Sequence, residues 1–363
     1  MIALRRVLGD RTPGLRNKVI GLYLLLISAS VVLWALSFLS ALSYPVILAL
    51  GLSAFTLGLR HAFDADHIAA IDNVTRKLMQ ENKKPVAVGF FFSLGHSTVV
   101  FLMAALVAAG AAFAASITND NSPIKQAGAL IGTSVSAIFL FALAIMNLVI
   151  LAEVVKTFRK VTHGGTYDEA AIEEYLSKRG FFARIFRGIF KSIDKSWKMY
   201  PLGFLFGLGF DTATEIILLG LAGSAAGNLH LPVYVTLLLP LLFTVGMSLA
   251  DTTDGVMMLG AYGWAFVNPV RKLYYNVTIT LISVIIALVI GSIETLGIFA
   301  SRFKLSGGVW DLVGSVGNNF GQIGVGIIVV FVLSWGLSTV IYRVNRYDQL
   351  EARVVTPAPP ATD

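Results

Sequence analysis

Long apolar runs are the dominant pattern along the chain. Eight of them exceed the roughly 18 consecutive residues that mark a transmembrane helix, and they lack the two-residue alternation of membrane β-barrel strands. We therefore expect an all-α fold, a polytopic transmembrane helix bundle of eight spans. The runs extend over about Val19–Leu39, Tyr44–Ala70, Pro85–Ala112, Ala127–Leu151, Tyr200–Ala222, Leu231–Gly260, Val270–Phe299 and Gly317–Ile341.

The segments between the runs divide the chain into five parts. Near the end of the central loop, apolar residues recur at helical spacing among arginines and lysines, which predicts an amphipathic helix on the inner leaflet. The C-terminal tail is proline-rich and polar, so we expect it to be disordered. The parts are a basic cytoplasmic arm at 1–18, spans one to four at 19–157, a cytoplasmic loop at 158–198, spans five to eight at 199–342 and a cytoplasmic tail at 343–363.

Positive charge is concentrated on one side of the expected membrane. With the loops assigned alternately to the two sides, nearly all Lys and Arg residues fall on one side, and Lys125, Arg302 and Lys304 fall on the other. Because Lys and Arg collect in cytoplasmic loops, we expect both termini in the cytoplasm and the chain in the cytoplasmic (inner) membrane, surrounded by lipid. This distribution explains the net charge of +7 without a nucleic-acid partner.

The residue types that are missing restrict the chemistry. The chain has no cysteine, so thiolate metal sites, disulfides and iron–sulfur clusters are excluded, and any metal must be bound by nitrogen and oxygen. No phosphate-binding loop is present, so the chain does not hydrolyse ATP itself, and no ATPase subunit is evident in it. We expect no resident cofactor.

Ionisable residues lie inside the apolar runs. Each charge near the bilayer centre costs about 2.5–3.5 kcal/mol on insertion scales, so these groups must face inward and be compensated. In the second, fifth and sixth runs, six carboxylates accompany a single arginine, Arg60, and the missing positive charge must come from protons or a divalent cation. Such residues mark ion or substrate pathways. They are Arg60, His61, Asp64, Asp66, His67, His96, Asp211, Glu215, Asp251 and Asp254.

The second run carries the densest group. On a regular helix His61, Asp64 and His67 share one face, and two imidazoles with a carboxylate suit nickel, cobalt or zinc. Arg60 is four residues before Asp64, where we expect it to act as the counter-charge. Asp66 points about 140° away from His61, so it joins the cluster only if the helix is locally unwound, which the sequence leaves open.

Other runs supply a supporting polar path. His96 shares a face of the third run with two serines, and a carboxylate pair lies one turn apart in the fifth and again in the sixth run. Asn147 is a weaker candidate, because single amides often only join helices. The supporting set is Arg60, Ser93, Ser97, Asn147, Asp211, Thr212, Glu215, Ser248, Asp251 and Asp254.

Short motifs recur in the two halves of the chain. FSLGHS at 92–97 matches FTVGMS at 243–248, and Phe63-Asp64 matches Phe210-Asp211. Spans two and three therefore resemble spans five and six, and a shift of three spans reverses direction. This pattern is typical of inverted repeats, from which many secondary transporters build alternating access around a midplane site. We expect that site between spans two, three, five and six, with the first and eighth spans peripheral.

Four motifs, RHAFDADHI, LGHSTVV, LGFDTATE and GMSLADTTDG, together resemble the signature set of the nickel/cobalt transporter (NiCoT) family of secondary permeases. The resemblance implies that His61, Asp66 and His67 form the family's histidine-x4-aspartate-histidine element, with Asp64 between them and His96 as the third-span histidine. It also implies high-affinity uptake of nickel or cobalt that feeds metalloenzymes. The central loop holds only His163, which favours uptake over the related exporters with histidine-rich loops.

Other classes fit the sequence less well. An intramembrane metalloenzyme is the main alternative, but HExxH and a nucleophile elbow are missing, and five histidines are too few for a desaturase-like cluster. A cation channel is a third interpretation, which unsaturable transport at low metal would reveal. We therefore expect a transporter rather than an enzyme.

Overall fold

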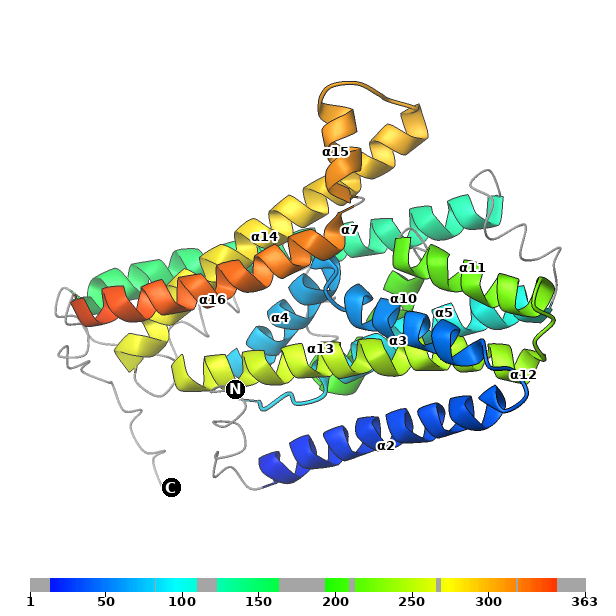
Figure 1. Cartoon of the computed structure of the whole chain (residues 1–363). Helices are drawn as coiled ribbons and strands as arrows, with labels where there is room; N and C mark the ends of the chain where they lie inside the picture. The colour runs from blue at the N-terminus through cyan, green and yellow to red at the C-terminus, as the bar shows by residue number, and fades with distance from the viewer. Residues whose placement is uncertain are drawn as a thin grey trace, which may run out of the picture.

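The computed structural model describes residues 14–81, 83–109, 123–162, 193–208, 213–265, 269–317 and 319–344. These residues form helices and contain no strand (Figure 1), so the expected all-α class is confirmed for this part. The helices are α2 Leu15–Ala41, α3 Ile47–His61, α4 Ala65–Gln80, α5 Val88–Ala109, α7 Pro123–Thr162, the 3-10 turn η1 Ser196–Lys198, α10 Met199–Gly207, α11 Ala213–Gly227, α12 Val233–Thr236, α13 Leu238–Ala265, α14 Pro269–Phe303, α15 Val309–Gly317 and α16 Phe320–Val344.

Within the described residues, four helices are long and apolar enough to cross a membrane by themselves, in α2, α5, α12–α13 and α14. A fifth span results if α15 and α16, which are bent by 80° at their junction, are counted as one. The second run is divided between α3 and α4, and the fifth between α10 and α11, so each half is too short to qualify. The structure thus supports several spans, and the number eight stays a prediction.

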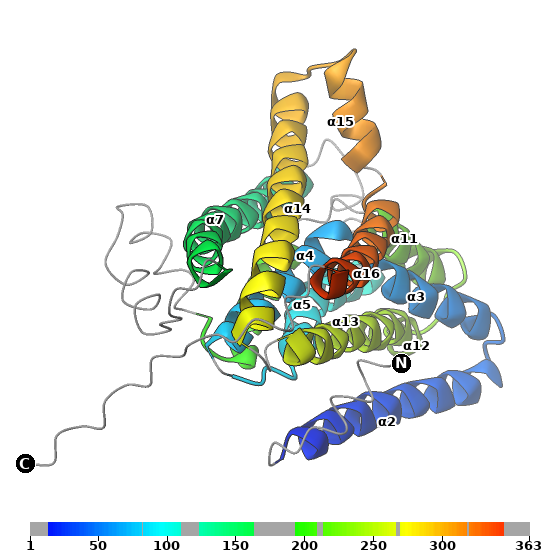
Figure 2. The same cartoon turned by 90° about the vertical axis from the view of Figure 1, so that its left-hand side faces the viewer.

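Three close helix pairs build the bundle: α3 with α13, α5 with α10, and α7 with α14. The first helix, α2, runs along the outside of α13, on the opposite side of the bundle from α7 and α14 (Figures 1 and 2). Most of its large apolar side chains are exposed, as expected for a peripheral helix that faces lipid.

Glycines allow the backbones of α3 and α13 to touch. A Cβ atom at Gly58 would collide with the carbonyl of Phe243, and one at Gly246 would collide with the carbonyl of Phe55. Small residues at such positions are typical of membrane helix interfaces, where association depends on close packing.

Helices α5 and α10 are also in backbone contact through glycines. Gly203 lies against the carbonyl of Phe92, and Gly95 lies against the carbonyl of Tyr200. Each of the two pairs is therefore held at backbone contact from both sides.

Helix α4 lies at the centre of the bundle. Every residue from Ala65 to Met79 is buried except Asp66. The loop assignment behind the charge count placed Arg76 and Lys77 in the segment between the second and third runs. Both instead lie on a buried helix, where Arg76 is 1% exposed and Lys77 is 7% exposed. The apolar residues Ile68, Ile71, Val74 and Leu78 continue at helical spacing past the predicted end of the run at Ala70, and they keep this polar helix inside the protein.

The chain is interrupted between α3 and α4. Ala62 and Phe63 form a turn, and Asp64 has an extended backbone (φ −65°, ψ 144°) before α4 begins. A Cβ at Gly324 of α16 would collide with the Phe63 carbonyl, so α16 packs directly on the interruption. The eighth run is therefore not peripheral, because it covers the break in the second.

Several expectations fall on residues outside the described ranges. These are most of the amphipathic loop helix, the N-terminal arm before Gly14, the tail after Val344, and the site candidates Asp211 and Thr212.

We predict that Gly58→Ala destabilises the protein. The added methyl group collides with the Phe243 backbone, and overpacking of this kind costs about 1–3 kcal/mol, which exceeds the roughly 1 kcal/mol that alanine gains over glycine in helix propensity. Gly21→Ala is the matched control, because nothing lies within 4 Å of its Cβ position. Thermal unfolding in detergent should show a lower midpoint for Gly58→Ala alone. Equal midpoints for the two variants would refute the backbone contact.

Candidate metal centre

Three histidines converge inside the bundle. His61 is the last residue of α3, His67 lies in the first turn of α4, and His96 lies in α5. Their ring centroids form a nearly equilateral triangle with sides of 4.7, 4.7 and 4.8 Å, and one ring nitrogen of each lies within 4.8 Å of the others. All three side chains are buried. Such a triangle of imidazoles is the donor set that suits a first-row divalent transition metal.

Carboxylates hold the outer nitrogens of two of these rings. His61 Nδ1 lies 3.0 Å from Asp64 Oδ2 and 2.9 Å from Thr214 Oγ1. His67 Nδ1 lies 3.2 Å from Asp251 Oδ2. When each Nδ1–H donates to its carboxylate, each Nε2 keeps a free lone pair, and this arrangement orients ligating histidines in metal sites.

The Nε2 atoms of the three histidines point toward one another, and their hydrogen bonds are incompletely satisfied. His96 Nε2 lies 2.9 Å from His61 Nε2 and also 2.9 Å from Glu215 Oε1. A ring nitrogen carries at most one proton, so a single hydrogen cannot satisfy both contacts well. His67 Nε2 is buried with no hydrogen-bond partner among the described residues. A cation coordinated by these atoms would satisfy all of them at once.

The break before α4 brings Asp66 to the same region. Asp66 lies in the first turn of α4, directly before His67. On an unbroken helix this residue would point away from His61. Because the helix is interrupted at Ala62–Asp64, the direction of Asp66 relative to His61 is no longer fixed by the geometry of a regular helix.

The expected ion pair between Arg60 and Asp64 is not formed. Arg60 lies on the exposed side of α3, beside Thr56 and Gln322 in a cavity that none of the three histidines lines. Asp64 instead pairs with His61. The helix ends at His61, so the four-residue spacing that would align Arg60 with Asp64 no longer applies.

The supporting candidates are partly brought together. Ser93 Oγ and Ser248 Oγ are 2.9 Å apart and join α5 to α13. Ser97 is also buried, and its hydroxyl has no partner among the described residues. Asp254 lies one turn beyond Asp251 on α13.

A second buried polar cluster contains Asn147, and its other members are not among the residues expected from the sequence. Asn73 Oδ1 accepts from Asn147 Nδ2 at 2.7 Å and from an Arg76 guanidinium nitrogen at 2.9 Å, and Arg76 also donates to Thr280 at 2.8 Å. Asp72 accepts from Ser283 Oγ at 2.9 Å. Thr214 was missed as well. The signal that locates the cluster is the helical spacing of Ile68, Ile71, Val74 and Leu78 beyond the apolar run.

The helical architecture, the membrane-length apolar helices and the buried nitrogen–oxygen cluster together define a multi-pass membrane protein with a candidate site for a divalent transition metal. A family model described as NicO, high-affinity nickel-transport protein, matches residues 47–341. The chain belongs to this family, which confirms the resemblance seen in its four motifs.

Curated relatives support the same assignment. The high-affinity nickel transport protein of Cupriavidus necator is 49% identical over 338 residues, covering 93% of this chain and 95% of the relative. Nickel transporter NicT of Mycobacterium tuberculosis is 50% identical over 86% of this chain and 82% of its own length. Cobalt transport protein NhlF of Rhodococcus rhodochrous is 40% identical over 78% of this chain and 80% of its own length. The chain is accordingly a transporter and not an enzyme.

No solved structure matches the chain. The geometry of the site therefore rests on the contacts described above.

We predict that Asp251→Asn lowers nickel affinity about 10–100-fold, because the amide holds the His67 ring less well than a carboxylate, and loss of such outer partners typically has this effect. Isothermal titration of the detergent-purified protein with NiCl₂ measures it. Asp311→Asn is the control, since Asp311 is exposed on α15 and caps Gly307 N through Oδ1, a contact that asparagine can also make. Unchanged affinity in Asp251→Asn would exclude its role at His67.

Proposed function

We propose that this protein imports nickel and/or cobalt dications across the cytoplasmic membrane through a site formed by His61, His67 and His96. Asp64 and Asp66 complete the ligand region. The observation that carries the proposal is the buried triangle of imidazoles, in which carboxylates contact Nδ1 of His61 and Nδ1 of His67. The names of the relatives, nickel transporters and one cobalt transport protein, agree with the metals that this donor set prefers.

The choice of metal follows from the donors. Imidazole nitrogen with a few carboxylate oxygens suits nickel, cobalt and zinc, whereas calcium and magnesium prefer oxygen alone. Copper(I) favours soft sulfur ligands, which a chain without cysteine does not supply as thiolate. The site therefore favours nickel and cobalt over the abundant hard cations.

An inverted repeat of spans two and three with spans five and six is supported by the glycine contacts. Phe55-Thr-Leu-Gly58 corresponds to Tyr200-Pro-Leu-Gly203, and Phe92 corresponds to Phe243. The contact of Gly58 with Phe243 then corresponds to the contact of Gly203 with Phe92. A duplicated unit explains why two stretches that are far apart in the chain make the same backbone contact between a glycine and a phenylalanine.

Under this repeat, transport proceeds by rocking of the two units around a shared site, the usual mechanism of such folds. We infer eight spans with both termini in the cytoplasm. Whatever the topology, an inside-negative membrane potential favours the inward movement of a cation. A dication that moves inward at 100 mV gains about 4.6 kcal/mol, twice the value for one elementary charge. No ATP hydrolysis is required for uptake against a moderate gradient.

We predict that His67→Ala abolishes saturable uptake of radioactive nickel by cells that lack their own importer, because removal of one imidazole leaves too few donors. His230→Asn is the matched control. His230 is exposed and has φ +49°, a conformation that asparagine adopts readily. Membrane insertion of both variants is checked by immunoblot.

Three results would contradict the proposal. Uptake by His67→Ala at the wild-type level would remove the site. Metal-dependent efflux from preloaded cells without uptake would identify an exporter of the same superfamily. Uptake that does not saturate would identify a channel.

A further inference from the structure

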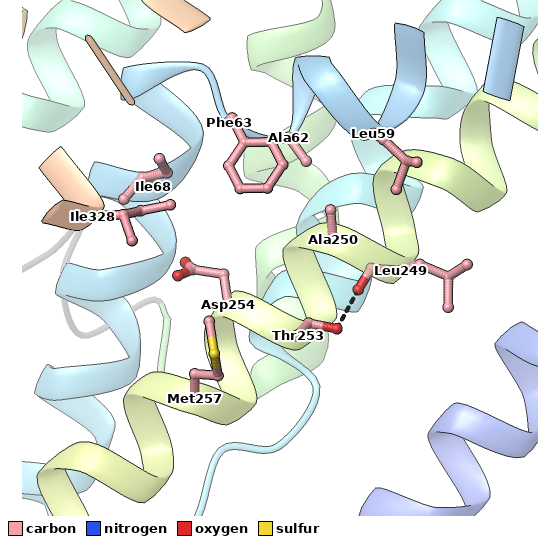
Figure 3. Close-up of a pocket in the computed structure, with 10 residues that line it drawn as sticks. All are labelled: Leu59, Ala62, Phe63, Ile68, Leu249, Ala250, Thr253, Asp254, Met257 and Ile328. Carbon is pink, nitrogen blue, oxygen red and sulfur yellow. Dashed lines mark hydrogen bonds between the residues drawn. The ribbon is translucent and has the colours of Figure 1, made fainter. Parts of the chain in front are cut away.

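Asp254 is a buried carboxylate that the metal site does not use. Its side chain lies on α13, is 8% exposed, and has no hydrogen-bond partner for either oxygen among the described residues. Figure 3 shows it pointing toward α4, below Ile68 of α4 and Ile328 of α16, with Met257 beneath it. These residues border a cavity of about 230 Å³ whose wall includes Ala62 and Phe63, at the break that follows His61.

The surroundings of Asp254 disfavour a negative charge. The charged groups that act on it are two further acids, Asp72 from α4 and Asp251 from its own helix. Helix α5 approaches α13 here through Gly89 and Gly255, α16 contributes Ile328, and Tyr23 of α2 binds the neighbouring Thr253. Among the described residues that line the cavity, none is a Lys, Arg or His.

The two nearby arginines are engaged elsewhere. Arg76 donates to Asn73 and Thr280, and Arg60 borders the separate cavity lined by Thr56 and Gln322. An ionised carboxylate in apolar surroundings without a partner is costly. In the metal-free protein Asp254 is therefore favoured in its neutral form, which carries a proton.

A dication at the histidine triangle would act against this preference. Asp251 contacts His67 at 3.2 Å and lies one helical turn from Asp254, so the metal charge is separated from Asp254 by one carboxylate. A nearby positive charge favours the ionised form of an acid.

We propose that Asp254 carries a proton in the metal-free transporter and releases it when the metal binds, so that metal transport is linked to proton movement. This inference rests on the proposed function. The step balances as the Asp254 carboxylic acid giving its carboxylate and one proton, which passes to water in the cavity. By linkage, the proton weakens metal binding as much as the metal weakens proton binding, so metal affinity rises with pH.

Calorimetric titration with NiCl₂ in buffers of different ionisation enthalpy counts the protons released per metal. We expect Asp254→Asn to release about one proton fewer than wild type, since metal-linked ionisation of that group is lost. We also expect its nickel affinity to depend less on pH. Asp311→Asn, which changes an exposed acid on α15, should match wild type. An equal proton count in Asp254→Asn and wild type overturns the inference.

A second measurement needs no destabilising variant. Infrared difference spectra of the wild-type protein should show loss of a protonated carboxyl band when NiCl₂ is added, and Asp254→Glu should shift the frequency of that band. Absence of the loss, or a band that Asp254→Glu leaves unshifted, overturns the inference. Failure of the wild-type protein to bind nickel at all would instead refute the proposed metal site, so the two failures are distinguishable.

Discussion

Backbone amides and carbonyls cannot remain without partners in lipid, because each unsatisfied group costs several kcal/mol. The interruption between α3 and α4 is therefore tolerated only inside protein. The amides of Phe63 and Asp64 bond to the carbonyls of Arg60 and His61, and the Asp64 carbonyl accepts from Ile68. Gly324 of α16 brings a second backbone against the Phe63 carbonyl. Because of this protected interruption, His61 and His67 lie on separate helices, and their imidazole rings are in contact.

Much of the fold and part of the site follow from the sequence. Apolar runs locate the helices because the bilayer demands long apolar segments, and the cost of charge in lipid identifies His61, His67 and Asp251 as inward-facing groups. These are local rules, and each needs only the residues of one run.

The sequence does not reveal whether an apolar run forms one continuous helix or two helices separated by a break. The same residues fit a continuous helix or a broken one, and the break at Ala62 decides that Asp66 approaches the histidines and that Arg60 does not pair with Asp64. The polar half of α4 is predicted to be a loop, because hydropathy alone predicts that Arg76 is exposed to water. Only the packing of the surrounding helices makes room for its guanidinium.

The buried polar cluster on α4 also has a mechanical consequence. Asn73 binds Asn147 of α7, Arg76 binds Thr280 of α14, and Asp72 binds Ser283 of α14. If α4 slid independently of its neighbours, these groups would lose their partners in an apolar interior, at about 1–3 kcal/mol each. Helices α4, α7 and α14 are thus expected to move as one stiff body, so that any displacement of α4 carries α7 and α14 with it.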